Sequence, residues 1–490
     1  MKAPLNSRSR RLIWLRSVLE KRSGSGVGIV AIVLLGFLGF TQIFPNGLLV
    51  YPILLIIGYE FQKRLDQGVP LLQLTSLIAV LQWLVGPLLS YAYGNMGDRY
   101  TMYVPEPEYF QFAIPGTAFF VAVMLSTGAS VKQTNLLQMV DRRNFFAIGF
   151  FLNVVATVAI LVAPRVGGGL QFALFLTSQL RYVGAIYFMF SRSKLRLLFA
   201  AGSCVQLVSN SVEEGMFHDL ILWVALLFCY WFAQRKWTLS VKLSLLLVAA
   251  ISLFSIQVVK QEYRLLKARG ENPSLVGMII SYMTPGGKAW DTSVISLAIT
   301  RLNQGWIISA IMKNVPENVP FAEGETIQEA FFVSAVPRFL FPDKATAGGL
   351  KNFRKYTGLV IDDGTTFGLS PLGEAYLNYG VVGGIGFMLV FGGCFAIFYY
   401  GTLRFALKQP TFLFWIPLIF YQAMKAETEL LVILNQLIKG SMVAFGGYYA
   451  VRQILPVKLK KDRKIPMSVV PPVPLGAQGL LGSGTIERAN

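Results

Sequence analysis

Apolar segments long enough to cross a membrane follow one another along most of this chain. A transmembrane helix needs about 20 predominantly apolar residues, and the polar positions between such runs mark where each segment ends. Twelve segments result: 27–44, 47–61, 70–93, 109–128, 144–163, 168–190, 195–211, 216–233, 239–258, 372–400, 410–424 and 429–451. The second, seventh and eleventh are short, so each crosses with little tilt or re-enters on the same side. The pattern predicts an all-α polytopic membrane protein with about 12 transmembrane helices.

One long polar interval, residues 259–371, interrupts the run of apolar segments. Structureless connections longer than about 15 residues are uncommon and are usually functional or disordered, and this interval is too rich in Phe, Val, Ile and Pro for disorder. We expect a large loop that carries short helices. The chain then divides into a tail (1–26), about nine spans (27–258), the loop, about three spans (372–455) and a second tail (456–490), whose Pro, Gly and Ser content is typical of disorder.

Residues 292–312 within this loop are apolar enough to be considered a further span, but Arg301 lies in their middle. A central Arg raises the free energy of membrane insertion by about 2.5 to 3.5 kcal/mol. The apolar positions follow a helical stripe, which suits a helix that lies on the membrane or packs against the bundle. We interpret this segment, and the shorter 274–283, as interfacial or loop helices.

Composition and charge support the membrane class and orient it. Hydrophobic residues make up 54% of the 490 residues, charged residues only 14%, and the mean hydropathy is +0.55, whereas soluble domains carry roughly 25% charged residues. Most of the basic residues behind the net charge of +19 lie in the two tails and in alternate loops. The positive-inside rule then places both termini in the cytoplasm and the loop 259–371 on the extracytoplasmic side. We expect the basic tails to contact anionic membrane lipids and not nucleic acid.

Sequence signatures of several common chemistries are missing. The chain has no GxxxxGK[ST] phosphate-binding loop, so ATP is not expected to power it. Its single histidine, His218, excludes a His-rich metal site and argues against a Ser-His-Asp triad. Because His218 lies beside Glu213, Glu214 and Asp219 at the outer entrance of a helix, we favour a structural or interfacial role for it. We expect no metal and no cofactor.

A candidate anion-binding segment lies late in the loop, where the chain reads FFVSAVPRFLFPDK from residue 331 to 344. Its two prolines disfavour a helix through Arg338 and favour a rigid, exposed turn. Arg presents a planar fork suited to phosphate, and Lys a compact point charge. We therefore favour anion binding for Arg338, with Lys344 nearby, whereas Lys351 and Lys355 suit an ordinary solvated face.

A second candidate is Glu374, which begins the tenth apolar segment. Asn378 lies four residues later, so both side chains project from the same helical face. A carboxylate that faces a bundle at the membrane surface is a functional candidate, but a Glu in the first turn of a helix is also favoured by the helix dipole. Both interpretations stay open. Glu427 and Glu429, at another outer end of a span, carry the same ambiguity, and for them we favour topology or partner contacts.

These features together resemble the Wzy-type polymerases of oligosaccharide repeat units, which assemble bacterial O-antigen, capsule and exopolysaccharide. The matching parts are VPRFLFPDK (336–344), the Gly-Thr-Thr turn (364–366) and GEAYLNYGVVGGIG (373–386), together with the many spans and the one large outer loop. The resemblance implies a GT-C-like fold in the bacterial cytoplasmic (inner) membrane. It implies glycosyl transfer between two polyprenyl-diphosphate-linked oligosaccharides on the outer face, without nucleotide or metal, with a chain-length regulator and a flippase as possible partners.

The resemblance also implies roles for individual residues. Arg338, assisted by Lys344 or Arg301, would stabilise the leaving diphosphate, and Glu374, or failing that Asp343, would accept the proton of the attacking hydroxyl. Further contacts to diphosphate or sugar are expected from Arg264, Arg354, Tyr376 and Asn378.

Three alternatives remain from the sequence. An O-antigen ligase-like glycosyltransferase is disfavoured because the outer-loop His motif of that family is missing. A lipid-linked oligosaccharide flippase or other transporter is disfavoured because transporters usually show repeated halves, whereas these spans divide nine and three around the loop. The third alternative is a non-catalytic scaffold of a polysaccharide export system.

Overall fold

The computed structural model describes residues 19–20, 25–93, 100–127, 130–131, 133–167, 169–214, 217–284, 286–287, 296, 299–336, 350–361 and 367–458. Within these residues the chain is almost entirely helical, which confirms the all-α prediction. The described residues also contain two strands of two residues each, Leu19–Glu20 (β1) and Ser130–Val131 (β2), which pair antiparallel.

Six helical segments of the described residues are long and apolar enough to cross a membrane, so the chain is consistent with a membrane protein. The first is Leu71–Tyr93, where α4 (Leu71–Val80), a π-helical turn η1 (Leu81–Val85) and α5 (Gly86–Tyr93) run on without a break. The others are α6 (Glu106–Thr127), α8 (Phe145–Val162), α14 (Leu239–Ala268), α20 (Pro371–Lys408) and α22 (Leu430–Ile454). Shorter apolar helices include α2 (Gly26–Thr41) and α13 (His218–Phe232).

Several predicted spans have a different form in the structure. Within predicted span 168–190 the described residues form two short helices, α9 (Gly169–Ser178) and α10 (Leu180–Phe190). Predicted span 195–211 consists of α11 (Arg196–Gly202) and the start of α12 (Val205–Glu214). Segment 410–424 is η4 (Pro410–Trp415), α21 (Ile416–Phe420) and η5 (Gln422–Met424), and it is almost wholly buried. An apolar run in this sequence therefore predicts that its residues are buried. Some of these residues pack against protein and not against lipid.

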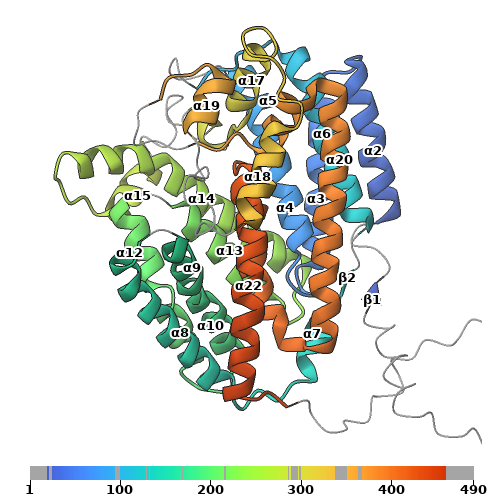
Figure 1. Ribbon diagram of the computed structural model, residues 1–490. Coiled ribbons are helices and arrows are strands. Elements are labelled where there is room, and N and C mark those ends of the chain that lie inside the picture. Colours follow the sequence, from blue (N-terminus) through green and yellow to red (C-terminus); the bar gives the residue numbers. More distant parts are fainter. Residues whose placement is uncertain are drawn as a thin grey trace, which may run out of the picture.

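A close-packed layer of long helices forms one side of the bundle. Figure 1 shows α2, α6 and α20 side by side, followed by α3 (Asn46–Arg64). Glycines allow the close approach: a Cβ added at Gly36 of α2 would lie 2.9 Å from Ala118 of α6, and one at Gly392 of α20 would lie 2.6 Å from the carbonyl oxygen of Phe120. Small residues at such positions let membrane helices pack backbone to backbone.

Helix α20 is broken at Gly380, where φ is 65° and ψ is −159°. A Cβ added at Gly384 would lie 3.0 Å from the carbonyl oxygen of Ala375, although in a straight helix the Cα atoms of these residues would be about 13 Å apart. The first arm, 371–379, therefore folds back against the long second arm. The predicted span 372–400 is not one straight helix, because only glycine readily adopts the backbone conformation at its break.

The interval 259–371 contains short helices, as expected. The first part of it continues α14 to Ala268, and α15 (Leu275–Met283) follows. Three more helices gather at one end of the bundle (Figure 1): α17 (Gly305–Asn314), α18 (Glu325–Ala335) and α19 (Leu350–Thr357). The sequence allowed two environments for this region, the membrane surface or the side of the bundle. Helix α17 is buried almost throughout, so it packs against the bundle.

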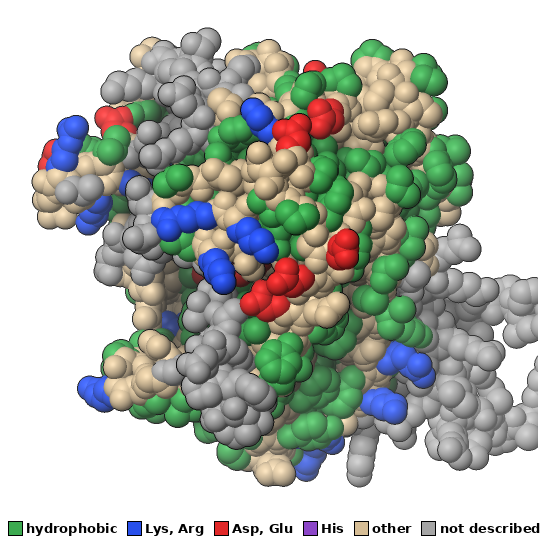
Figure 2. All heavy atoms as spheres, turned by 45° about the horizontal axis from the view of Figure 1, so that its top comes forward, with side chains coloured by type: hydrophobic (Ala, Val, Ile, Leu, Met, Phe, Trp, Pro, Cys, Tyr) green, Lys and Arg blue, Asp and Glu red, His purple; other side chains and the backbone are tan. Residues whose placement is uncertain are grey.

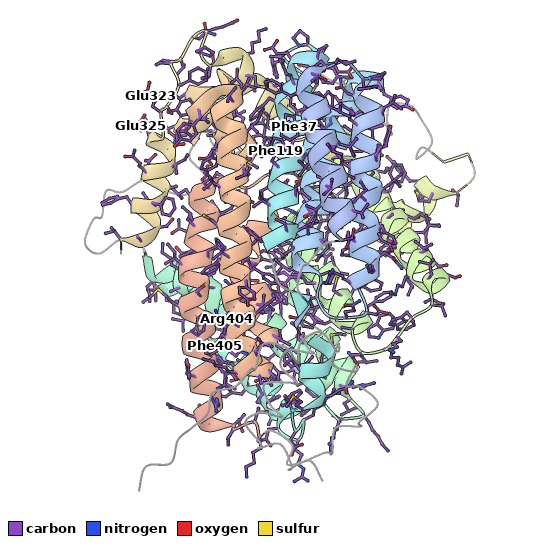
Figure 3. The ribbon with its side chains drawn as sticks, turned by 90° about the vertical axis from the view of Figure 1, so that its right-hand side faces the viewer. Phe37, Phe119, Glu323, Glu325, Arg404 and Phe405 are labelled. Atoms are coloured by element: carbon purple, nitrogen blue, oxygen red, sulfur yellow. The ribbon has the colours of Figure 1, made fainter. Side chains whose placement is uncertain are left out.

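The surface at this end is charged. Basic and acidic side chains gather side by side on it (Figure 2), and the Nζ atom of Lys355 on α19 lies 3.8 Å from a carboxylate oxygen of Glu325 on α18. Both side chains are exposed, as is Lys351, which agrees with the solvated face predicted for the two lysines. Figure 3 shows Glu323 and Glu325 at this end of the bundle and Arg404 of α20 toward the other.

Candidate functional site

Segment 425–430 runs from the end of η5 to the first residue of α22, and its residues interact with the groups of the candidate site described below. The Nζ atom of Lys425 lies 2.9 Å from Oδ1 of Asp219 at the start of α13. The carbonyl oxygen of Ala426 accepts hydrogen bonds from Trp83 Nε1 (3.1 Å) and Ser370 Oγ (2.7 Å). These contacts reach three separate parts of the chain, so they hold the residues that follow Ala426 in place.

Glu427 pairs with the only histidine of the chain. Its Oε1 lies 2.6 Å from His218 Nδ1, and its Oε2 accepts a hydrogen bond from Gln304 Nε2 at 3.2 Å. Gln304 is itself held by its backbone N–H, which donates to the carbonyl oxygen of Gln82 in the π-helical turn (3.1 Å). The side chains of His218 and Glu427 are 39% and 34% exposed, so the pair is only partly buried.

The pKa of Glu427 is lowered by its neighbours. Burial raises the pKa, but the hydrogen bond from His218 and the charges of His218, Lys425 and Lys260 more than offset this effect. Glu427 is therefore an anion at neutral pH, and it favours the His218 tautomer that carries its proton on Nδ1. When the imidazole is neutral, its Nε2 then holds a free lone pair, which is the arrangement by which a carboxylate orients a histidine base.

A group of three cationic side chains reaches this pair through Lys260, whose charge acts on Glu427. Lys260 and Arg264 are one turn apart on α14, and Arg301 comes from the short helical stretch before α17; their charges act on one another, and Lys260 also interacts with Glu427. Burial lowers the pKa of the Arg301 guanidinium, Tyr100 opposes this and Arg264 adds to it, yet an Arg stays charged. None of the three forms an ion pair with a carboxylate among the described residues. We call Lys260, Arg264 and Arg301 the cationic cluster.

Glu374 lies in a separate buried network. Its Oε1 accepts a hydrogen bond from the backbone N–H of Leu430 (2.6 Å), the first residue of α22, and its Oε2 accepts one from Thr326 Oγ1 of α18 (3.3 Å). Asn378 Nδ2 donates to Thr326 Oγ1 and to the Glu374 carbonyl oxygen, both at 2.8 Å. The shared helical face predicted for Glu374 and Asn378 is thus confirmed.

Glu374 does interact with a helix end, as one of the two interpretations of the sequence expected, but the helix is a different one. The Glu374 side chain caps the N-terminus of α22 and not that of its own helix, because it accepts the hydrogen bond from Leu430. The residue is 3% exposed and both oxygens are occupied within the protein. Through Leu430 this network holds one end of segment 425–430, while Lys425 and Ala426 hold the other. The catalytic role expected for Glu374 stays a prediction.

The other predicted site residues are distributed as follows. Arg338, Asp343 and Lys344 lie outside the described residues, as does the turn 364–366. Arg354 on α19 donates from its guanidinium to the carbonyl oxygen of Ile361, so it secures its own loop. Tyr376 is 7% exposed and packs its ring on Phe112 of α6, with centroids 5.3 Å apart. The structure therefore brings together Arg264 and Arg301, and separately Glu374 and Asn378.

Sequence reasoning missed the pairing of His218 with Glu427 and the membership of Lys260 in the cluster. One local signal was present, since Lys260 and Arg264 are four residues apart and share a helix face. For His218 the sequence neighbour Asp219 pairs with Lys425 instead, and the partner Glu427 lies far along the chain. Among the described residues no group of three or more His, Cys, Asp or Glu side chains is placed to hold a metal ion.

Comparison with known proteins gives one finding. A family described as a domain of unknown function, DUF8712, matches residues 109–402, which include His218, the cationic cluster and Glu374. Neither curated proteins nor solved structures give a match. Since the matched residues make up more than half of the sequence, the chain belongs to the DUF8712 family.

Proposed function

We propose that this protein polymerises polyprenyl-diphosphate-linked oligosaccharide repeat units by glycosyl transfer on the outer face of the bacterial cytoplasmic membrane. The observation that carries the proposal is the cationic cluster, which interacts through Lys260 with Glu427 of the His218–Glu427 pair. A diphosphate is a group with several negative charges. Neighbouring cations that form no ion pair with a carboxylate of the described residues are suited to bind it. A histidine oriented by a carboxylate is suited to take a proton from an alcohol.

The proposed step joins the two substrates at the site. A sugar hydroxyl of the incoming repeat unit attacks the anomeric carbon of the growing chain, and the bond from that carbon to the diphosphate oxygen breaks. The polyprenyl diphosphate leaves with the electron pair, and the cationic cluster stabilises its developing charge. His218 Nε2 takes the hydroxyl proton while Glu427 holds Nδ1 protonated. Glu374 then serves as a positioning residue, because it anchors the segment that carries Glu427.

The wider architecture belongs to the same proposal. Twelve membrane passages, a GT-C-like arrangement and cytoplasmic termini would put the cationic cluster and the short helices α17 to α19 at the outer surface. The position of Arg404 toward the end opposite Glu323 and Glu325 (Figure 3) supports this orientation, since basic residues favour the cytoplasmic side.

The proposal is tested by reconstituting the purified protein with lipid-diphosphate-linked repeat units and separating the products by length. We expect a ladder of chain lengths from the wild-type protein. Replacing the base, His218→Asn, should slow elongation by about 10² to 10⁴-fold, and Arg301→Gln should slow it by about 10²-fold. Lys351→Gln, which removes an exposed cation outside the cluster, is the matched control and should elongate normally. Normal ladders from both site variants would remove the site assignment.

A transporter of lipid-linked oligosaccharides is the second candidate, and one observation favours it. The break in α20 at Gly380 and the irregular, buried segment 410–424 place interrupted helices inside the bundle, a feature of secondary transporters. The same vesicles distinguish the two functions, because transport would move the substrate across the bilayer without lengthening it.

A further inference from the structure

A cavity of about 240 Å³ lies where α20 and α22 both end. This is the part of the bundle remote from the short helices α17 to α19 (Figure 1). A cavity that holds one water molecule needs a volume of only about 10 to 15 Å³, whereas the pockets of drug-sized ligands have volumes of about 300 to 1,000 Å³. The cavity therefore has room for a small group such as a phosphate with its immediate substituents, and not for a large metabolite.

The floor of the cavity is a set of buried hydroxyl groups. Tyr448 of α22 donates to Gln409 Oε1 at 3.2 Å and lies 3.3 Å from Thr411 Oγ1, and the hydroxyl of Tyr187 on α10 accepts a hydrogen bond from Trp415 Nε1 at 3.3 Å. Tyr448, Thr411 and Tyr187 are all at most 4% exposed. Hydroxyl groups can turn their protons toward an anion, because each carries a donor and two acceptor lone pairs.

Two cationic side chains lie at the mouth of the cavity. Lys408 comes from the last turn of α20 and Arg452 from the last turn of α22, and both are exposed. Among the described residues no Asp or Glu lines the cavity, and neither cation forms an ion pair with a carboxylate. The remaining lining, including Val140, Val451 and Leu455, is apolar.

Helix dipoles alone also favour cations at these two helix ends, but they do not account for a cavity with a floor of buried hydroxyls. Both helices are candidate membrane spans that end here, so the cavity would lie at the level of the lipid headgroups. We propose that it binds the phosphate group of an anionic membrane lipid, with Lys408 and Arg452 as charge partners and the apolar rim against the glycerol end of the lipid. The Tyr448 hydroxyl is the donor, and its proton turns from Gln409 Oε1 to the phosphate when the lipid binds. This site is independent of the function proposed above.

The test measures lipid binding by native mass spectrometry of the full chain released from nanodiscs of phosphatidylcholine, with or without phosphatidylglycerol. Wild-type protein should retain phosphatidylglycerol in preference to phosphatidylcholine. Lys408→Gln and Arg452→Gln should each weaken retention about fivefold, and Tyr448→Phe should weaken it while the protein stays folded, because the ring is kept. Arg404→Gln removes an exposed cation one turn away on the same helix that does not line the cavity, and it should leave retention within about twofold.

Equal retention by wild type and all three cavity variants would overturn the proposal, as would an effect of Arg404→Gln as large as that of Lys408→Gln. Inorganic phosphate provides the second arm of the experiment. If it displaces phosphatidylglycerol from wild-type protein, the phosphate group alone accounts for recognition. If phosphate binds at the cavity and the lipid does not, the lipid assignment is wrong.

Discussion

At the scale of single residues, the charge of Glu427 depends on its surroundings. Its pKa is lowered overall, because the hydrogen bond from His218 and the charges of His218, Lys425 and Lys260 outweigh burial. A carboxylate whose folded pKa lies below its unfolded value, about 4.3 for Glu, stabilises the fold above that value and loses this contribution as the pH falls through the folded pKa. We expect Glu427→Gln to lower the thermal midpoint of the purified protein at pH 7. The difference from wild type should shrink below about pH 4.

The exposed Glu325→Gln is the control for this measurement, since that carboxylate lies at the surface with a side chain 71% exposed. It should change the midpoint little at either pH. A Glu427→Gln deficit that stays constant from neutral to acid pH would show that the charge of Glu427 does not stabilise the fold.

Glu374 offers a second prediction at this scale, because a structural cap and a catalytic base respond differently to the same change. Glu374→Ala leaves the Leu430 N–H and the Thr326 hydroxyl without their buried acceptor, so it should lower the free energy of unfolding by about 2 kcal/mol. Glu374→Gln keeps one oxygen for the Leu430 N–H and should be milder. The comparison is made by thermal unfolding in detergent together with the chain-length assay. If the Glu374→Gln protein is stable but produces no ladder of chain lengths, Glu374 has the catalytic role that the sequence predicted.

At the scale of the element, the break in α20 decides where Glu374 lies. Gly380 has a positive φ that L-residues rarely adopt, and an added Cβ would also lie 3.2 Å from the ring of Phe321. We expect Gly380→Ala to lower the free energy of unfolding by about 1 to 3 kcal/mol. Gly386→Ala in the same helix meets nothing within 4 Å and should be neutral or stabilise the protein by up to about 1 kcal/mol. Equal thermal midpoints for the two variants would contradict the fold-back of the first arm.

The periodic, apolar elements could be predicted from sequence, whereas their breaks could not. The long spans around α6, α8 and α22 lie within a few residues of the predicted ones. The predicted spans 168–190 and 195–211 instead break into pairs of short helices. Hydropathy reports that a residue is buried, but it does not distinguish lipid from protein as the surrounding medium.

At the scale of the whole molecule, the orientation of the bundle gives the fourth prediction. In a background without native cysteines, Glu323→Cys should react with a membrane-impermeant maleimide in intact cells. Arg404→Cys should react only after the membrane is permeabilised, because the two positions lie toward opposite ends of the bundle (Figure 3) and the basic end is expected inside. Labelling of both positions in intact cells would contradict the span count, and the reverse pattern would place the cationic cluster in the cytoplasm.

The candidate site is where sequence and tertiary structure differ most. The sequence showed which charges are unusual in so apolar a chain, and it marked Arg264, Arg301 and Glu374 as candidates. It did not show that Glu374 caps a distant helix or that His218 lies against Glu427. Such pairs are far apart in the chain, and the contact between them exists only because segment 425–430 is held by Trp83, Ser370 and Asp219.

The sequence by itself determined a helical chain with membrane-compatible spans and a charged interval between them, because helix formation and apolar burial follow from residues that are neighbours in the chain. Tertiary structure alone decided which charges meet. A hydrogen bond or a charge cluster forms between groups a few ångströms apart in space. The folding back of α20, the packing of α13 against α14 and the position of segment 425–430 set those distances.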